Sequence, residues 1–181
     1  MTQFMIIALP RSRTKWLSKF LSYGGKKVGH DLIVDCASVS EFAQVFAQHD
    51  GSCETGAVVG WRRLRHELPN LKIIVIKRSA EDVAHSLVGK GFVPDPRVLI
   101  EREIELEELS QQPGVLSFDF DQLDEENVCK EIFEQALELK WDRAWWLAIR
   151  HENIQVDFSA RLAVLSQNAA RLVQFTQEVM R

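Results

Sequence analysis

The pattern of apolar and polar positions along the chain predicts short buried strands that alternate with amphipathic helices. Residues 4–9 form an uninterrupted apolar run that Pro10 ends. This run is too short for a membrane span and has the right length for a buried parallel strand. A β-branched run at residues 72–77 and a segment at residues 115–119 predict two further strands. Together they predict a short parallel sheet.

Helices are predicted between and after these strands. Apolar residues recur at helical spacing before Gly24 and Gly25, so a helix is expected from residue 14 to about residue 23. Residues 27–31 are expected to form a short strand or loop, and the glycine-flanked segment 51–56 a turn. Further helices are predicted at residues 38–48, 57–67, 97–112, 124–139, 142–150 and 159–180. The fold class is therefore α/β.

The turn after the first strand carries an unusual concentration of positive charge. Arg11, Arg13 and Lys15 crowd the point where the strand meets the next helix. A helix N-terminus presents unpaired backbone N–H groups and the positive end of the helix dipole, so cations are misplaced there unless an anion is bound. A bound phosphate or sulfate would accept hydrogen bonds from the N–H groups and balance the positive charges. The alternative is that the three cations are solvated loop residues.

A second strand-to-helix junction has similar chemistry. Arg78 follows the strand at residues 72–77, and Ser79 with Asp82 forms a pattern typical of a helix N-cap. Ser86 lies one turn beyond Asp82 on the same helix face. Because ligands of open α/β sheets bind outside the carboxyl ends of the strands, both junctions are expected at one edge. The pair predicts a ligand with two separated anionic groups.

These two segments resemble the paired signatures of the sulfotransferases that use 3'-phosphoadenosine 5'-phosphosulfate. The first family signature, PKSGTTW or PRSGTTW, corresponds to PRSRTKW at residues 10–16, and the second, RNPxDVxxS, to RSAEDVAHS at residues 78–86. A weaker match is VLSFDFDQL at residues 115–123, which resembles a later VxxYEDL segment. The resemblance covers roughly residues 4–139. The form LPRSRTxWL, followed later by a His-Asp pair, also resembles short phage and bacterial members of this sulfotransferase family.

The resemblance implies a three-layer P-loop NTPase-like fold with a short parallel sheet, and 3'-phosphoadenosine 5'-phosphosulfate as the donor without a metal. Backbone N–H groups of residues 12–16 and the Thr14 hydroxyl would hold the 5'-phosphosulfate. Arg11 would neutralise charge as the S–O bond breaks. Trp16 would pack on the adenine, and Arg78 with Ser86 would contact the 3'-phosphate. The candidate catalytic residues are Arg11, Lys15 and His30, and the candidate donor-binding residues are Ser12, Arg13, Thr14, Trp16, Arg78 and Ser86.

Some of these positions have a second interpretation. The alternative for Trp16 is a helix residue facing the core, and the alternative for Ser86 is an ordinary serine on a helix surface. Arg13 and Lys15 stand where the family has Gly and Thr. Glycine allows positive φ, so Arg13 implies either a turn with ordinary negative φ or a guanidinium that replaces lost amide contacts. No GxxGxWK-like segment is found near the C-terminus.

Sulfuryl transfer to a hydroxyl needs a positioned base, and the chain offers two main candidates. His30 is preferred, because the segment at residues 27–31 can return to the sheet edge and Asp31 could orient the imidazole. Glu54, on the predicted turn, is the substitute. His66 and His85 are weaker candidates, because His66 has no obvious partner and His85 is expected on a different helix face from Ser86.

Length and cysteine content indicate a single intracellular domain. At 181 residues with 46% hydrophobic content, residues 1–181 are expected to bury one core. Cysteines at positions 36, 53 and 129 have no metal-ligand or redox spacing, which favours a reducing cytoplasm over zinc or disulfides. No signal peptide or anchor is recognised at the N-terminus.

The net charge of −4 is unevenly distributed, because 14 of the 26 acidic residues lie between positions 101 and 142. Nucleic acid is therefore not an expected partner, and no membrane partner is expected. The acidic face of residues 97–112 would be solvated, or else contact a cationic acceptor or a protein partner. A loop marked by Pro94 and Pro96 could cover the site. The sequence leaves the acceptor, a small molecule or a glycan, and the oligomeric state open.

The preferred hypothesis is a sulfotransferase that moves a sulfuryl group to a hydroxyl or amine. The first alternative is a catalytically silent nucleotide-binding or interaction protein of the same fold. A P-loop kinase-like phosphotransferase is third, because no GxxxxGK[ST] run is present to bind a triphosphate.

Overall fold

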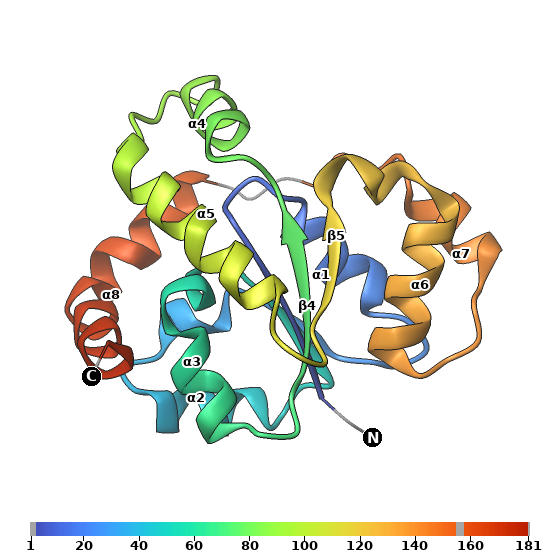
Figure 1. Ribbon diagram of the computed structural model, residues 1–181, viewed down its shortest axis with the longest axis horizontal. Coiled ribbons are helices and arrows are strands. Elements are labelled where there is room, and N and C mark those ends of the chain that lie inside the picture. Colours follow the sequence, from blue (N-terminus) through green and yellow to red (C-terminus); the bar gives the residue numbers. More distant parts are fainter. Residues whose placement is uncertain (1–2, 155–157, 181) are drawn as a thin grey trace.

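The computed structural model describes residues 3–154 and 158–180, which form a five-stranded parallel sheet in the order β2-β3-β1-β4-β5 (Figure 1). The central strand β1 is completely buried and pairs with β3 and β4. This explains why its sequence is apolar at every position, since both of its faces are covered by helices. The strands are β1 (Phe4–Ala8), β2 (Val28–His30), β3 (Gly51–Glu54), β4 (Lys72–Lys77) and β5 (Leu116–Asp119).

Helices cover both faces of the sheet, and each face has its own hydrophobic cluster. Phe4, Ile6 and Ala8 of β1 pack on one side, whereas Met5 and Ile7 pack on the other. The first side holds α1 (Thr14–Leu21), α6 (Glu126–Leu137) and α7 (Arg143–Ile149). The second side holds α2 (Val39–Phe46), α3 (Trp61–Glu67), α5 (Pro96–Ser110) and α8 (Phe158–Val179), with the short 3-10 helices η1 (Leu32–Asp35) and η2 (Gly56–Gly60).

The helix α4 (Ala80–Val88) packs against α5 beyond the carboxyl end of β4 (Figure 1). Its N-cap is Ser79, whose hydroxyl accepts a hydrogen bond from the backbone N–H of Asp82 at 3.1 Å. Ser38 caps α2 in the same way. Both N-terminal signals were predicted from the sequence and are confirmed, because a side-chain oxygen satisfies a backbone donor that the helix itself leaves open.

The predicted strands at residues 4–9, 72–77 and 115–119 are confirmed, and so is the α/β fold class. The prediction of a turn at residues 51–56 is wrong, because Gly51–Glu54 is the strand β3 and lies between β1 and β2. Ladder partners on both sides impose the extended conformation on a segment of low β-propensity. The predicted helix at residues 57–67 is divided into η2 and α3, and Pro96, assigned to a loop, is the first residue of α5.

The carboxyl end of β1 is a topological switch point of the sheet. After β1 the chain continues through α1 on one face of the sheet, whereas after the neighbouring strand β3 it continues through η2 and α3 on the other face. Where connections of adjacent strands leave to opposite faces, their carboxyl ends separate and open α/β sheets bind ligands. The turn predicted to hold an anion begins at this point.

Three further findings concern the described residues. No helix among them is long and apolar enough to cross a membrane. The cysteines Cys36, Cys53 and Cys129 are free and buried. No group of three or more His, Cys, Asp or Glu side chains in this part of the chain is arranged to hold a metal ion.

Candidate functional site

The turn between β1 and α1 has an unusual backbone conformation. Arg11 and Arg13 both have left-handed conformations, with φ of 67° and 58°. Positive φ at a residue other than glycine costs free energy and persists where the surrounding structure enforces it. Successive turns of this kind direct backbone N–H groups toward one concavity, and α1 adds the open N–H groups of its first turn. The sequence alternative of a turn with ordinary negative φ at Arg13 is therefore wrong.

Ser12 lies at the centre of this turn. It is completely buried, and its hydroxyl has no hydrogen-bond partner among the described residues. A buried hydroxyl without a partner costs free energy comparable to a lost hydrogen bond, so its presence calls for an explanation. An anion bound in the turn would supply the missing acceptor.

The two predicted junctions meet through Arg11. The Arg11 guanidinium donates through Nε to the Ser86 hydroxyl of α4 at 3.1 Å. Arg78, at the carboxyl end of β4, donates to the backbone carbonyl of Arg11. The sequence therefore placed Arg11, Arg78 and Ser86 correctly at one edge of the sheet, although it predicted no contact between them.

The Arg78 guanidinium packs over the aromatic ring of Phe120, a residue that was not predicted from the sequence to lie at the site. The guanidinium lies 4.0 Å from the ring centre of Phe120, the first residue of the 3-10 helix η3 (Phe120–Asp124). Burial lowers the pKa of the Arg78 guanidinium, and Asp82 partly opposes this effect. Its Nε is buried and has no hydrogen-bond partner in the part of the chain that the structure describes. The signal that could have found Phe120 is its position directly after a strand at the same sheet edge.

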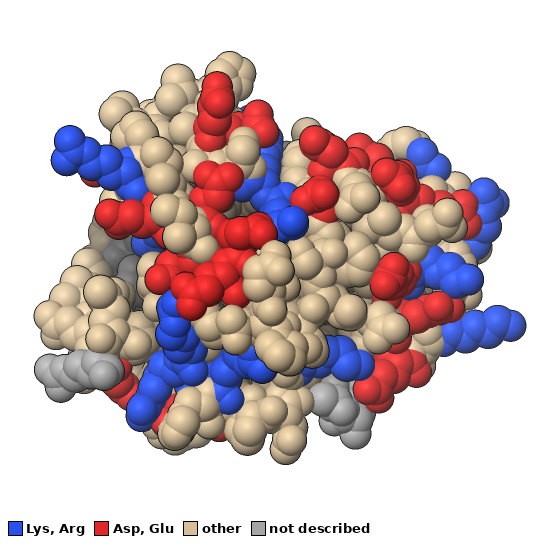
Figure 2. All heavy atoms as spheres, viewed as in Figure 1, with Lys and Arg blue, Asp and Glu red and all other residues tan. Residues whose placement is uncertain are grey.

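Beside Arg78 lies a pocket of about 320 Å³ that is open to solvent. Figure 2 shows acidic side chains gathered with a few basic atoms on the face where α5 and β5 lie. Lys77 lies 3.8 Å from Glu107 and 3.6 Å from Asp119. The carboxylates that line the pocket outnumber Lys77 and Arg78; they are Asp82, Glu103, Glu107, Asp119 and Asp121.

Arg13 does not point its charge at the turn. Its guanidinium donates to Asp124 at 2.7 Å and lies over the ring of Trp16, 4.3 Å from the ring centre. It also reaches the carbonyl of Arg150 at 3.4 Å. Asp124 belongs to η3, and Arg150 is the residue that follows α7. The predicted contact of the Arg13 side chain with the donor is therefore not supported, because its charge is already balanced elsewhere.

Trp16 belongs to the core. It is 2% exposed, its ring stacks on Phe20 at 4.9 Å between ring centres, and its indole N–H donates to the carbonyl of Ile149 at 3.0 Å. With Arg13 over the ring, the geometry agrees with the core-facing interpretation and not with packing on an adenine. Lys15 lies exposed on the first turn of α1.

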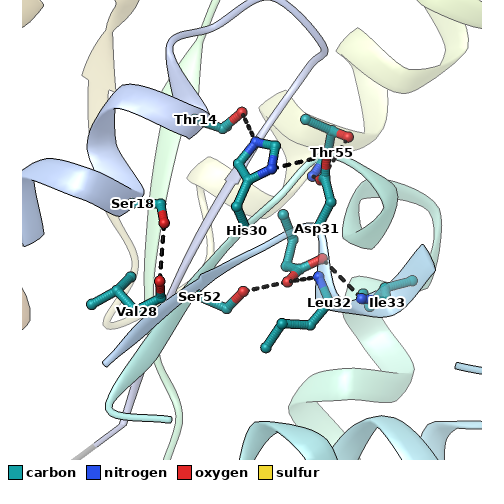
Figure 3. Close-up of polar contacts among 10 residues, drawn as sticks. Thr14, Ser18, Val28, His30, Asp31, Leu32, Ile33, Ser52 and Thr55 are labelled. Carbon is teal, nitrogen blue, oxygen red and sulfur yellow. Dashed lines mark hydrogen bonds and ion pairs between the residues drawn. The ribbon is translucent and has the colours of Figure 1, made fainter. Parts of the chain in front are cut away.

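Behind the turn, a chain of polar contacts links three neighbouring strand ends (Figure 3). The Thr14 hydroxyl, at the start of α1, lies 3.1 Å from Nε2 of His30 at the end of β2. Nδ1 of His30 lies 3.6 Å from the Asp31 carboxylate. That carboxylate accepts hydrogen bonds from the backbone N–H and the hydroxyl of Thr55, at 2.7 and 2.9 Å. The sequence suggested the pairing of His30 with Asp31 but missed Thr55, since β3 was not predicted.

Glu54, the substitute base, is completely buried. Its carboxylate accepts hydrogen bonds from the hydroxyl of Ser52 and from the backbone N–H groups of Leu32 and Ile33. Burial, assisted by the charge of Asp31, raises the pKa of Glu54 to about 8. Both of its oxygens thus accept hydrogen bonds from backbone N–H groups at the start of η1. Because its pKa is about 8, the carboxyl group is protonated at neutral pH. His66 and His85 are exposed on α3 and α4.

Comparison with known proteins assigns the fold. No family model matches the sequence, and a search of curated proteins finds no match. Among solved structures, a mouse sulfotransferase, SULT7A1 complexed with PAP, aligns with a TM-score of 0.57 and 12% identity over 87% of this chain and 69% of that one.

A sulfotransferase from Alicyclobacillus acidocaldarius gives a TM-score of 0.53 with 10% identity, covering 100% of this chain and 96% of that one. A gluconokinase from Sinorhizobium meliloti 1021 gives a TM-score of 0.51 with 11% identity, covering 82% and 94%. At these identities the likeness defines the fold, which is that of the P-loop sulfotransferases and kinases.

Proposed function

We propose that the chain is a sulfotransferase that binds 3'-phosphoadenosine 5'-phosphosulfate and transfers its sulfuryl group to a hydroxyl or amine. The observation that carries this proposal is the physical connection of two anion-binding junctions through Arg11, which contacts both Ser86 and Arg78. One ligand with two anionic groups would satisfy both junctions at once. The mouse neighbour in complex with PAP supports the choice of nucleotide.

The turn would hold the 5' end of the donor. The unpartnered Ser12 hydroxyl and the N–H groups at the start of α1 would supply donors, and Arg11 would supply a positive charge near the bond being broken. Such preorganised charge acts without reorganisation at the moment of transfer. Arg78 and Ser86 would contact the 3'-phosphate.

His30 is the proposed base. Its Nδ1 faces the Asp31 carboxylate, which leaves Nε2 to accept a proton. The buried Glu54 is disfavoured because it already holds its proton at neutral pH and both of its oxygens face hydrogen-bond donors. We propose a small molecule or glycan as the acceptor. We also propose a cytoplasmic location, which suits the free thiols.

Thermal unfolding with three nucleotides tests this function. Adenosine 3',5'-bisphosphate should raise the melting temperature more than AMP or ATP at equal concentration, because ligand that binds the folded state stabilises it by mass action. Equal responses to the three nucleotides, or no response to any, would contradict the donor assignment. A preferential response to ATP would favour the kinase-like alternative, which the fold shared with the gluconokinase keeps open.

A silent nucleotide-binding protein is the second candidate. It is favoured by the orientation of Arg13, whose guanidinium pairs with Asp124 and is directed away from the turn. Transfer of labelled sulfate from the donor to a broad panel of hydroxyl and amine acceptors separates the two. Bisphosphate binding without any transfer would support the silent protein.

A further inference from the structure

Arg102 is a charged residue on the face of α5 that packs into the core. It lies three residues after Leu99 and four before Leu106, and both leucines are buried in the hydrophobic cluster on the second side of the sheet. Residues three and four apart share one face of a helix, so Arg102 belongs to the core-facing stripe of α5. It is half-buried.

The Arg102 guanidinium has no ion-pair or hydrogen-bond partner among the residues that the structure describes. Glu105, one turn further along α5, pairs with Arg62 of α3 instead. Burial lowers the pKa of the Arg102 guanidinium, as expected for a cation that is partly removed from water. A buried charge without a partner costs free energy, so its place on an apolar stripe calls for an explanation.

Arg102 lies level with the carboxyl edge of the sheet. The carboxylate of the next residue, Glu103, accepts a hydrogen bond from the backbone N–H of Ala80, the first residue of α4, at 3.2 Å. The helix α4 begins just beyond the carboxyl end of β4, and α5 runs beside β4 (Figure 1). Arg102 is therefore at the same edge of the sheet as the two junctions.

The two junctions already account for the anionic groups of the proposed donor. Arg78 and Ser86 would contact the 3'-phosphate, and Phe120, under Arg78, packs with α1 on the first side of the sheet. Arg102 belongs to the second side, whose cluster includes Leu9, the last residue before the turn that would hold the 5' end. A cation on this side is left for the other substrate.

We propose that Arg102 binds an anionic group of the acceptor, so that the acceptor is an acidic molecule that also carries a hydroxyl or amine. The inference rests on the proposed function, which supplies the donor and the transfer. A guanidinium donates paired hydrogen bonds to a carboxylate or phosphate, and an acceptor bound in this way would balance the charge that the free chain leaves unpaired.

Calorimetric titration of the full chain with phenols that differ in one charged group tests the inference, in the presence and absence of saturating adenosine 3',5'-bisphosphate. The probes are 4-hydroxyphenylacetate and 4-hydroxybenzylphosphonate, which are anionic, tyrosol, which is neutral, and tyramine, which is cationic. We expect at least one anionic phenol to bind about tenfold or more tightly than tyrosol, the scale of one charge-assisted contact. Tyramine should bind most weakly.

Two variants on α5 assign that preference to one residue. Arg102→Gln should remove the preference for the anionic phenols and leave tyrosol and bisphosphate affinities at the wild-type level. Arg97→Gln, at an exposed arginine of the same helix, is the matched control and should keep the preference. A preference that survives Arg102→Gln, or a loss of bisphosphate affinity in that variant, would overturn the inference.

The melting temperature of the ligand-free chain tests the cost of the unpaired charge. Arg102→Leu continues the apolar stripe, so the variant should melt at a higher temperature than wild type. Arg97→Leu, at the exposed position, should change the melting temperature little. A lower melting temperature for Arg102→Leu would show that the arginine serves the fold and would overturn the inference.

Failure of the inference is distinguishable from failure of the proposed function. If the chain binds the bisphosphate but binds no anionic phenol, or binds all four phenols equally, the inference is overturned and the donor assignment stands. If the bisphosphate does not bind, the donor assignment fails. Anionic phenols that then still bind wild type but not Arg102→Gln would support the anion site by itself.

Discussion

The two strand-to-helix junctions at the carboxyl edge of the sheet are built differently. At the junction of β1 and α1, polar groups are buried, and two arginines adopt left-handed backbone conformations. At the junction of β4 and α4, Ser79 caps the helix in the ordinary way and Arg78 borders an open pocket of about 320 Å³. Strained and buried polar residues persist where function or surrounding structure requires them. The first junction is thus buried and conformationally unusual, whereas the second is ordinarily capped and open to solvent.

The largest expected effect is a pH dependence of stability caused by Glu54, which is buried near the first junction. Glu54 has a pKa of about 8 in the folded chain against an ordinary value of 4.5. Between these values the unfolded chain binds fewer protons than the folded chain, so the free energy of unfolding should fall as pH rises from about 4.5 to about 8. Denaturant unfolding at a series of pH values measures this fall. Glu54→Gln should flatten the curve in that window, and an unchanged slope would show that Glu54 is not its source.

The next prediction tests whether Trp16, at the same junction, packs in the core or contacts the ligand. Trp16→Ala should lower the free energy of unfolding by about 3–5 kcal/mol, as expected when a large core side chain is removed. Urea denaturation gives the value. The opposite result, near-normal stability with loss of nucleotide affinity, would return Trp16 to the role of a ligand contact.

The second junction is tested by Arg78→Ala. One charge-assisted hydrogen bond contributes about 1.5–3 kcal/mol, which corresponds to roughly tenfold or more in affinity. We therefore expect weaker binding of adenosine 3',5'-bisphosphate, with little change for AMP, when both are measured by calorimetry. Arg63→Ala, an arginine on α3 that pairs with Glu67, is the control. If Arg78→Ala binds the bisphosphate as wild type does, the recognition site lies elsewhere.

The smallest effect concerns the ion pair that turns Arg13 away from the site. Asp124→Ala should change the free energy of unfolding by less than about 1 kcal/mol, because the carboxylate is 84% exposed and the pair is screened by solvent. Bisphosphate affinity should stay at the wild-type level. A clear change in affinity would show that the Arg13 guanidinium takes part in binding.

Features of the fold that depend on local sequence could be predicted, whereas features that depend on distant partners could not. The signals for β1, β4 and the Ser79 cap are local, because apolar runs and capping residues act within a few positions. The strand β3 depends on ladder partners from β1 and β2, so its sequence alone indicates a turn. Its absence from the prediction is also why Thr55 was missed.

Side-chain direction was the other feature that the sequence could not supply. Arg13 and Trp16 were predicted to contact a ligand from their places in a motif, but their partners Asp124 and Ile149 lie on η3 and α7, which meet them only in the folded chain. By contrast, Arg78 and Ser86 follow from helix geometry and strand order, which bring them to Arg11.

The central claim is that the two junctions bind the two ends of one nucleotide. Calorimetric titration of the wild-type chain with adenosine 3',5'-bisphosphate and with AMP tests it most directly. The account predicts that the bisphosphate binds at least about tenfold more tightly, because the second junction contributes one charge-assisted contact. Equal affinities for the two nucleotides would contradict it.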